Sequence, residues 1–133
     1  FLEWPDMKLL LDTHTFIWWD SDPVRLSTVA LGAIRDPANS VWLSVVSIWE
    51  MVIKADLGKL TLRLPIADIV AHQLANGLQL MNAEVSHVFA VEGLPKAHKD
   101  PFDRLLVGQA SVEAAHLVTV DPVFKPYPVR LIW

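Results

Sequence analysis

The chain has 133 residues, a length that fits one domain of ordinary size and leaves no room for two. Hydrophobic residues make up 53% and charged residues 20%, so the chain is too apolar to be disordered and is expected to build a packed core. The formal net charge of −4 argues against a protein that grips nucleic acid by bulk positive charge, so any phosphate-bearing partner has to be held locally by a few cations or by metal ions.

Taken in chain order, residues 1–6 precede a Met-Lys pair that resembles a natural start. We treat them as an N-terminal extension or an expression remnant, outside a single domain of residues 7–133. Short unbroken apolar runs then predict buried strands. These are Leu9–Leu11, Val41–Leu43, Leu78–Met81, Leu117–Val120 and, as a fifth, Val129–Trp133.

Amphipathic segments bounded by capping or stop residues predict the helices between these strands. A loop is expected at 20–23, followed by a helix that opens at Ser27 and is stopped by Asp36-Pro37. The remaining predicted helices are Ser47 to about Leu57, Pro65–Asn76, Ala83–Glu92 and, after a polar loop at 96–100, a helix from near Asp103 to Ala115.

Alternation of strands and helices predicts an α/β fold with three layers, α/β/α, around a central, mostly parallel sheet of four to five strands. In such sheets the functional residues gather at the carboxyl ends of the strands. The sequence therefore directs attention to the residues that follow each predicted strand.

Further limits come from residue usage. The chain has no cysteine, which excludes a disulfide scaffold, a thiolate zinc site and a cysteine nucleophile. The longest apolar stretch, Val41–Ile53, is interrupted by polar residues and is shorter than a membrane-spanning helix, so we expect no membrane association and a cytoplasmic location. The mean hydropathy of +0.35 is high for a soluble monomer and predicts apolar surface that meets another subunit or partner.

Acidic residues stand where the predicted topology brings segments together. Asp12 ends the first strand, Asp121 ends the fourth, and Glu50 lies in the first turn of the helix after the second strand. These three share one edge of the sheet, whereas Asp103 reaches it only if its own helix begins there. Clustered carboxylates repel one another unless a cation lies among them, and oxygen ligands without cysteine favour Mg²⁺ or Mn²⁺, with one or two ions per site.

Each acid also has a simpler explanation. Ser47 and Glu50 fit a capping box, Asp103 fits a helix N-cap, and Asp121 before a proline fits a turn. Asp12 is harder to explain in this way, because a charge placed directly after three buried leucines is costly unless it faces a cleft or a partner. One shared site accounts for all four residues more economically than four separate explanations.

Several neighbours of these acids are secondary candidates, each with an alternative. Asp100 is either an additional ligand or a solvated loop residue, and Arg104 either contacts phosphate or pairs with Asp100. Lys99 belongs to a small cationic patch or to a plain exposed loop. His14 orients a carboxylate, acts in proton transfer, or is structural. The last candidates are hydroxyls that could hold a water or a ligand oxygen, Thr13 and Thr119.

Four sequence blocks together resemble the PIN-domain family. They are Leu11-Asp12-Thr13-His14, Ser44 to Met51, His98 to Ala110 and Val118-Thr119-Val120-Asp121. The Asp-Pro-Phe-Asp-Arg run at 100–104 is the most specific of them. The resemblance spans roughly Met7 to Trp133, and the closest branch is that of VapC-type toxins of toxin–antitoxin pairs.

The resemblance implies a PIN-like fold and a Mg²⁺- or Mn²⁺-dependent endoribonuclease that hydrolyses RNA phosphodiesters. Carried over by position, the acidic metal site would be Asp12, Glu50, Asp103 and Asp121. The resemblance also implies a homodimer and a small antitoxin protein that blocks the active-site groove. Two alternatives stay open: a non-catalytic PIN scaffold that binds RNA or protein, and a housekeeping RNA-processing or DNA-directed nuclease.

Overall fold

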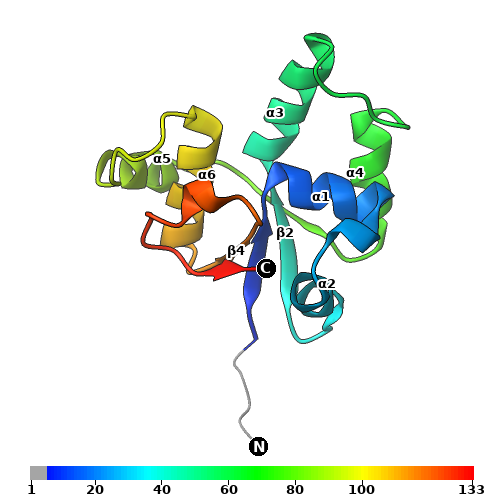
Figure 1. The fold of residues 1–133 in the computed structure, drawn as a ribbon, viewed down its shortest axis with the longest axis horizontal. Helices are drawn as coiled ribbons and strands as arrows, with labels where there is room; N and C mark the ends of the chain where they lie inside the picture. Colours follow the sequence, from blue (N-terminus) through cyan, green and yellow to red (C-terminus); the bar gives the residue numbers. More distant parts are fainter. Residues whose placement is uncertain (1–5) are drawn as a thin grey trace, which may run out of the picture.

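The computed structural model describes residues 6–133, and our expectation for residues 1–5 lies outside the described part (Figure 1). A single sheet of five strands runs through the molecule, all of them parallel, in the order β3-β2-β1-β4-β5. The prediction of a mostly parallel sheet with four to five strands is confirmed. The strands are β1 (Lys8–Leu11), β2 (Ser40–Ser44), β3 (Gln79–Met81), β4 (His116–Val118) and β5 (Leu131–Ile132).

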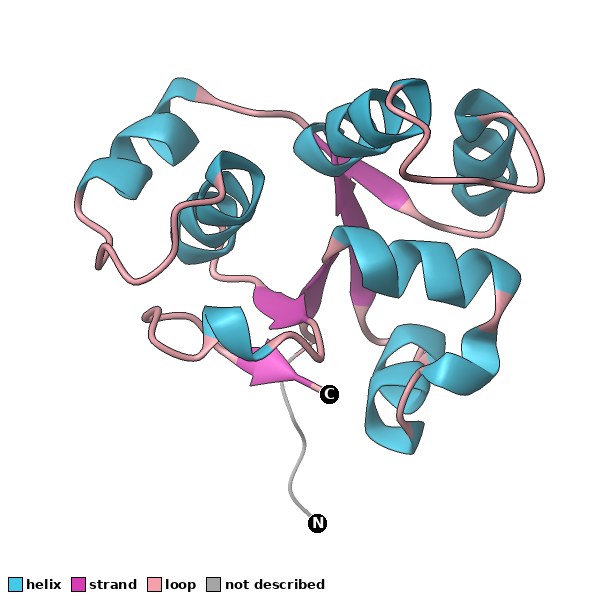
Figure 2. Ribbon diagram, turned by 45° about the horizontal axis from the view of Figure 1, so that its top comes forward, coloured by secondary structure: helices cyan, strands magenta, loops and turns pink. Residues whose placement is uncertain are grey.

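Helices cover both faces of this sheet (Figure 2). The α-helices are α1 (Thr13–Ser21), α2 (Thr28–Arg35), α3 (Val45–Asp56), α4 (Ile66–Ala75), α5 (Val85–Glu92) and α6 (Pro101–Val112), with short 3₁₀ turns η1 (Pro23–Arg25) and η2 (Pro122–Phe124). Among residues 6–133, none of these helices combines the length and the apolar character that crossing a membrane requires.

The side chains of β1 alternate between two hydrophobic cores, as the period of a strand demands. Leu9 and Leu11 pack in a core with residues of α1, α2, α3 and α4. Leu10 points the other way and packs with residues of α5, α6 and the 3₁₀ turn η2. All three leucines are fully buried. The central strand is therefore covered on both sides, which explains why its sequence is an unbroken apolar run.

The strand order changes direction at β1. From β1 the chain moves to β2 and β3 on one side, and it later returns to β4 and β5 on the other. In open α/β sheets, a crevice forms at the carboxyl ends of the strands where the order switches. Here that position lies between the ends of β1 and β4, and α1 and α3 start close by (Figure 1).

Three predicted boundaries are wrong in ways that matter for the site. Helix α1 follows β1 almost at once, where we expected no helix. Helix α3 begins at Val45 with Ser44 as its N-cap, so Ser47 does not cap it, the proposed capping box does not form, and Glu50 lies in the second turn. Helix α6 begins at Pro101 with Asp100 as its N-cap, so Asp103 is not the cap.

Candidate metal centre

A polar cavity of about 200 Å³ lies at the carboxyl edge of the sheet. All four acids that the sequence predicts for the metal site line it, although they come from four separate segments. The complete lining is Asp12, Thr13, His14, Glu50, Lys54, His98, Asp100, Asp103, Asp121 and Phe124. The cavity therefore gathers far more carboxylates than a neutral ligand would need.

Asp12 stands directly after β1 and caps helix α1. Its Oδ1 accepts a hydrogen bond of 2.8 Å from the Thr15 backbone N–H, and its Oδ2 accepts one of 2.5 Å from the Thr119 hydroxyl. Burial raises the pKa of this carboxyl above its ordinary value, although the hydrogen bonds from Thr119 and Thr15 oppose that rise. Asp12 is thus a buried acid held in one orientation.

Glu50 points from α3 into the same cavity and is almost fully buried. Its Oε1 accepts a hydrogen bond of 2.5 Å from the Thr13 hydroxyl, and its Oε2 lies 2.7 Å from Lys54 Nζ. Helix α1 places Thr13 at its first position, so the unpredicted helix supplies a group that holds Glu50. The hydrogen bond that Lys54 donates to Glu50, together with the charges of nearby carboxylates, raises the pKa of Lys54.

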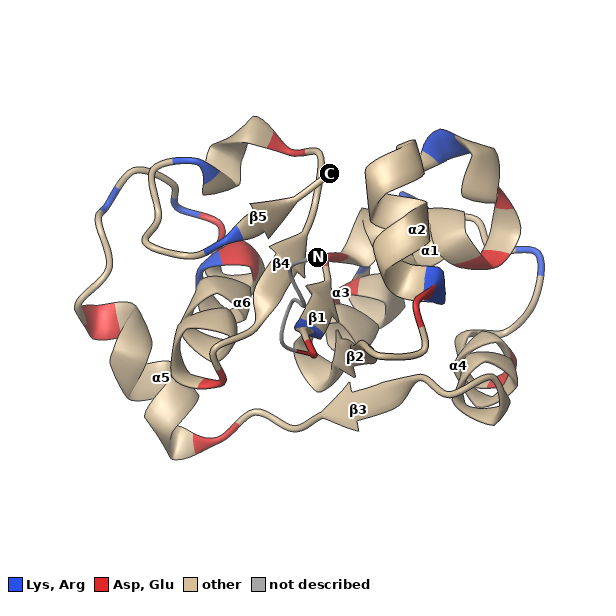
Figure 3. Cartoon of the chain, turned by 90° about the horizontal axis from the view of Figure 1, so that it is seen from below, with Lys and Arg blue, Asp and Glu red and all other residues tan. Residues whose placement is uncertain are grey.

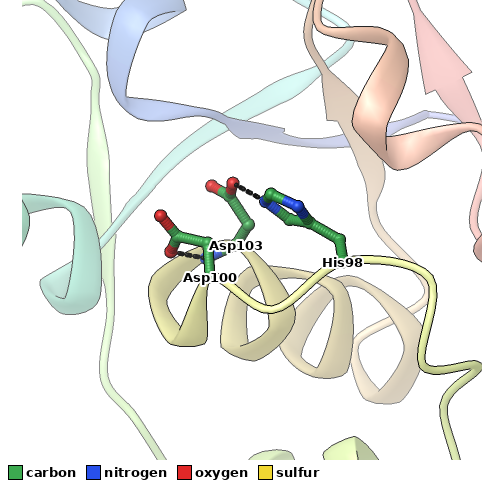
Figure 4. Close-up of side chains that lie close together, drawn as sticks. All are labelled: His98, Asp100 and Asp103. Carbon is green, nitrogen blue, oxygen red and sulfur yellow. Dashed lines mark hydrogen bonds and ion pairs between the residues drawn. The ribbon is translucent and has the colours of Figure 1, made fainter.

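Asp103, Asp100 and His98 form the tightest group in the cavity (Figure 4). Their ligand atoms all lie within 4.8 Å of one another, and His98 Nε2 lies 2.9 Å from Asp103 Oδ2. Asp100 Oδ1 accepts the backbone N–H groups of Phe102 and Asp103. Burial, reinforced by the charges of Asp100 and Glu50, raises the pKa of Asp103 to about 6 against the opposing effect of His98.

Asp121 is more exposed than the other acids and lies three residues beyond the end of β4. Its Oδ1 accepts the Val123 backbone N–H and so caps the 3₁₀ turn η2. Its own backbone N–H donates to the Thr119 hydroxyl over 3.0 Å. The turn explanation for Asp121 and its place in the cavity are therefore both correct.

The secondary candidates fall into two groups. Thr13 and His14 line the cavity, and buried Thr119 touches it through Asp12. Lys99 and Arg104 instead line a separate hollow beside α5. The guanidinium of Arg104 donates hydrogen bonds to the backbone carbonyls at 91, 95 and 98 and to the Tyr127 hydroxyl. These bonds connect α6 to the end of α5 and to the loop between the two helices, and they take the place of the expected pair with Asp100.

Two cavity residues escaped the sequence interpretation of the site. His98 lies in the polar loop expected at 96–100 but is not among the predicted ligands. The spacing of His98, Asp100 and Asp103, before and within the first helical turn, is the signal that could have identified it. Lys54 was overlooked, although a Glu and a Lys four residues apart on one helix are expected to pair. Figure 3 shows the Lys and Arg positions scattered among loops and helices. The positive charge of Lys54 matters because it lies inside the acidic cavity.

The donor set fits a divalent cation. Several carboxylates crowd one small cavity, and burial raises the pKa of two of them, Asp12 and Asp103, which is the behaviour of acids that lack a compensating positive charge. Carboxylate oxygens with one imidazole suit Mg²⁺ or Mn²⁺ better than a thiolate-seeking metal. The residues that could hold such an ion are Asp12, Glu50, Asp100, Asp103, Asp121 and His98.

Comparison with known proteins places this cavity in context. The family profile of the PIN domain matches residues 9–129. Ribonuclease VapC22 of Mycobacterium tuberculosis is 31% identical over 130 residues, which covers 94% of this chain and 98% of that protein. The residues matched by the family profile include every acid of the cavity.

Solved structures share the fold at lower sequence identity. VapBC2 from Rickettsia felis, bound to a DNA fragment of its promoter, gives a TM-score of 0.67 with 18% identity, covering 94% of this chain and 97% of that one. DNA-bound VapBC from Salmonella typhimurium gives a TM-score of 0.63 with 16% identity, covering 94% and 96%. These likenesses extend over nearly the whole chain and agree with the three-layer architecture.

Proposed function

This chain belongs to the PIN-domain family, and on that premise we propose that it is a metal-dependent endoribonuclease, acting as the toxin of a toxin–antitoxin pair. One observation carries the proposal: four acids from separate segments of the chain line a single small cavity where the strand order switches. A relative named as a ribonuclease, 31% identical over almost its full length, supports RNA as the substrate.

The metal ligands we propose are Asp12, Glu50, Asp103 and Asp121, with Asp100 as an additional one. The cofactor is Mg²⁺ or Mn²⁺, with one or two ions per site. When bound, such an ion makes water more acidic and offsets the negative charge that develops on the phosphoryl oxygens. The reaction adds water to phosphorus and breaks the bond to the departing 3′ oxygen.

The residues of the chain prepare the site before any substrate arrives. Thr119 and the backbone of Thr15 hold both oxygens of Asp12, and Thr13 holds one oxygen of Glu50. Fixed carboxylates need no reorganisation during the reaction, which is how a preorganised site lowers a barrier. His14 is an exposed residue that lines the cavity, and it is our candidate for proton transfer at the substrate.

The partners we propose are a small antitoxin protein and a second copy of the chain. The two solved structures compared above are of VapBC, and this likeness supports an antitoxin partner. The exposed apolar side chains support protein partners in general, because soluble monomers rarely display many. On α3 and α5 they are Val45, Trp49, Val52, Val85, Val88 and Phe89.

The decisive experiment is a cleavage assay with purified chain and labelled single-stranded RNA. We expect cleavage with Mn²⁺ or Mg²⁺, loss of cleavage with EDTA and recovery when Mn²⁺ is returned. RNA binding without cleavage under all these conditions would instead identify a binding module. Growth arrest on expression, relieved by the product of a neighbouring gene, tests the toxin role, and the absence of any growth effect would favour a housekeeping nuclease.

A further inference from the structure

Lys54 brings a fixed positive charge into the acidic cavity. It lies one helical turn after Glu50 on α3, with its Nζ 2.7 Å from Glu50 Oε2. Among the described residues that line the cavity, it is the only lysine or arginine. Lys99 and Arg104, which stand beside the acids in the sequence, line a different hollow.

The pair between Lys54 and Glu50 differs from an ordinary surface ion pair. The Glu50 side chain is only 6% exposed, whereas that of Lys54 is 37% exposed. Thr13 already donates to the other oxygen of Glu50, so the carboxylate is fixed independently of the lysine. An ammonium group has three N–H donors, and one bond to Glu50 leaves two for a ligand in the cavity.

An RNA phosphodiester is an anion, and this cavity presents five carboxylates to it. The acids attract a cation but repel the substrate, so binding of the phosphate needs positive charge beyond that which neutralises the acids. Lys54 is the protein group placed to supply it. An ammonium acts as a compact point charge toward phosphate.

Resting on the function proposed above, we propose that Lys54 binds the scissile phosphate of RNA and so serves as a substrate-binding residue of this site. The lysine keeps Glu50 as its partner and offers its remaining donors to the phosphate. The Lys54 side chain thereby supplies a positive charge that a further metal ion would otherwise have to supply. The alternative is that Lys54 only stabilises α3 through an i,i+4 pair.

The experiment compares K54M with K54R, both made in a D103N chain so that RNA stays intact during binding. Affinity for a labelled single-stranded RNA is measured by fluorescence anisotropy over a range of salt concentrations. We expect K54M to weaken binding about tenfold and to lower the salt dependence by about one phosphate contact, while K54R retains both. K59M removes the same charge from an exposed position after α3, outside the cavity, and serves as the matched control.

Two results would overturn this role. One is an unchanged salt dependence in K54M. The other is a loss of RNA affinity that K59M reproduces. Mn²⁺ titration of K54M by calorimetry, in the otherwise unaltered chain, adds a second readout: a phosphate-binding lysine predicts Mn²⁺ affinity that is unchanged or tighter, whereas a lysine that only positions Glu50 predicts weaker affinity. Metal-dependent cleavage by the unaltered chain is scored separately, so failure of the nuclease proposal is distinguishable from failure of the lysine's role.

Discussion

The Thr119 hydroxyl donates a hydrogen bond of 2.5 Å to Asp12 Oδ2, and its oxygen accepts the backbone N–H of Asp121. One buried hydroxyl thus ties together two acids that lie on different segments of the chain. Its removal leaves one oxygen of a buried carboxylate and one backbone N–H without their partners. The site depends on this residue even though Thr119 does not itself line the cavity.

We therefore predict that T119V lowers the rate of RNA cleavage by roughly 10- to 100-fold, the usual cost of losing a group that orients a metal ligand. It should also lower the free energy of unfolding by about 1–3 kcal/mol, because buried polar groups lose their partners. T119S keeps the hydroxyl and should retain most of the activity. Equal activity of T119V and T119S in a metal-saturated cleavage assay would contradict the orienting role.

Asp12 has a structural task and a proposed chemical one, and two substitutions separate them. Asn caps a helix about as well as Asp, so D12N should keep the bond to the Thr15 N–H and fold normally while cleavage is abolished. D12A should lose the cleavage and also about 1 kcal/mol of stability, since it removes the cap of α1. Circular dichroism with urea titration measures the stability difference. Cleavage by D12N at the rate of the unaltered chain would remove Asp12 from the mechanism.

The raised pKa of Asp103 has a consequence for stability in the absence of metal. The unfolded chain releases this proton near pH 3.8, whereas the folded chain keeps it until about pH 6. Folding therefore takes up a proton between these values, and the free energy of unfolding falls as pH rises through that window. The loss is complete about one pH unit above the folded pKa and amounts to on the order of 3 kcal/mol.

Urea titrations in EDTA at pH 4 and pH 7 measure this effect. D103N lacks the titrating carboxyl, so it should lose less stability than the unaltered chain between the two pH values and should be the more stable of the two at pH 7. Mn²⁺ should reverse that order at pH 7, because a ligand that binds only the folded state stabilises it. If the two chains respond identically to pH in EDTA, burial of Asp103 is not the source of this loss of stability.

The architecture was accessible from the sequence because parallel strands buried on both faces are unbroken apolar runs, and Leu9–Leu11 is one. Helix α1 was not, since its aromatic and β-branched residues lack a single apolar face. The spacing of Ser47 and Glu50 imitates a capping box, which concealed the earlier start of α3 at Val45 and its cap at Ser44. In both cases tertiary packing decides what local propensity leaves ambiguous.

Topology brings the ends of strands and the starts of the helices that follow them to one edge, so a shared position of Asp12, Glu50 and Asp121 could be expected from the sequence, which left open whether Asp103 joins them. The hydrogen-bond partners of these acids could not be predicted. Pairing of Thr119 with Asp12 depends on the exact reach of two side chains across neighbouring strand ends. The orientation of the Arg104 side chain depends on the backbone carbonyls of Val91 and Pro95, whose positions are defined only in the folded chain. The charges and spacing of residues in the sequence thus indicate where a site lies, whereas the hydrogen bonds within it can be described only from the three-dimensional structure.

Helices α5 and α6 pack so closely at Gly108 that a methyl group does not fit. A Cβ there would lie 2.6 Å from the backbone oxygen of His87, and a backbone atom cannot swing aside as the end of a side chain can. G108A should therefore lower the free energy of unfolding by about 1–3 kcal/mol.

Gly32 in α2 provides the matched control for this substitution, because a Cβ there meets nothing within 4 Å. G32A should be neutral or stabilising by up to about 1 kcal/mol, since alanine is the better helix former. Thermal unfolding of both variants, followed by circular dichroism, separates crowding from helix propensity. Both glycines lie outside the acidic cavity, so folded G108A should keep its affinity for Mn²⁺. A stability of G108A equal to that of G32A would mean that the two helices can move apart at no cost.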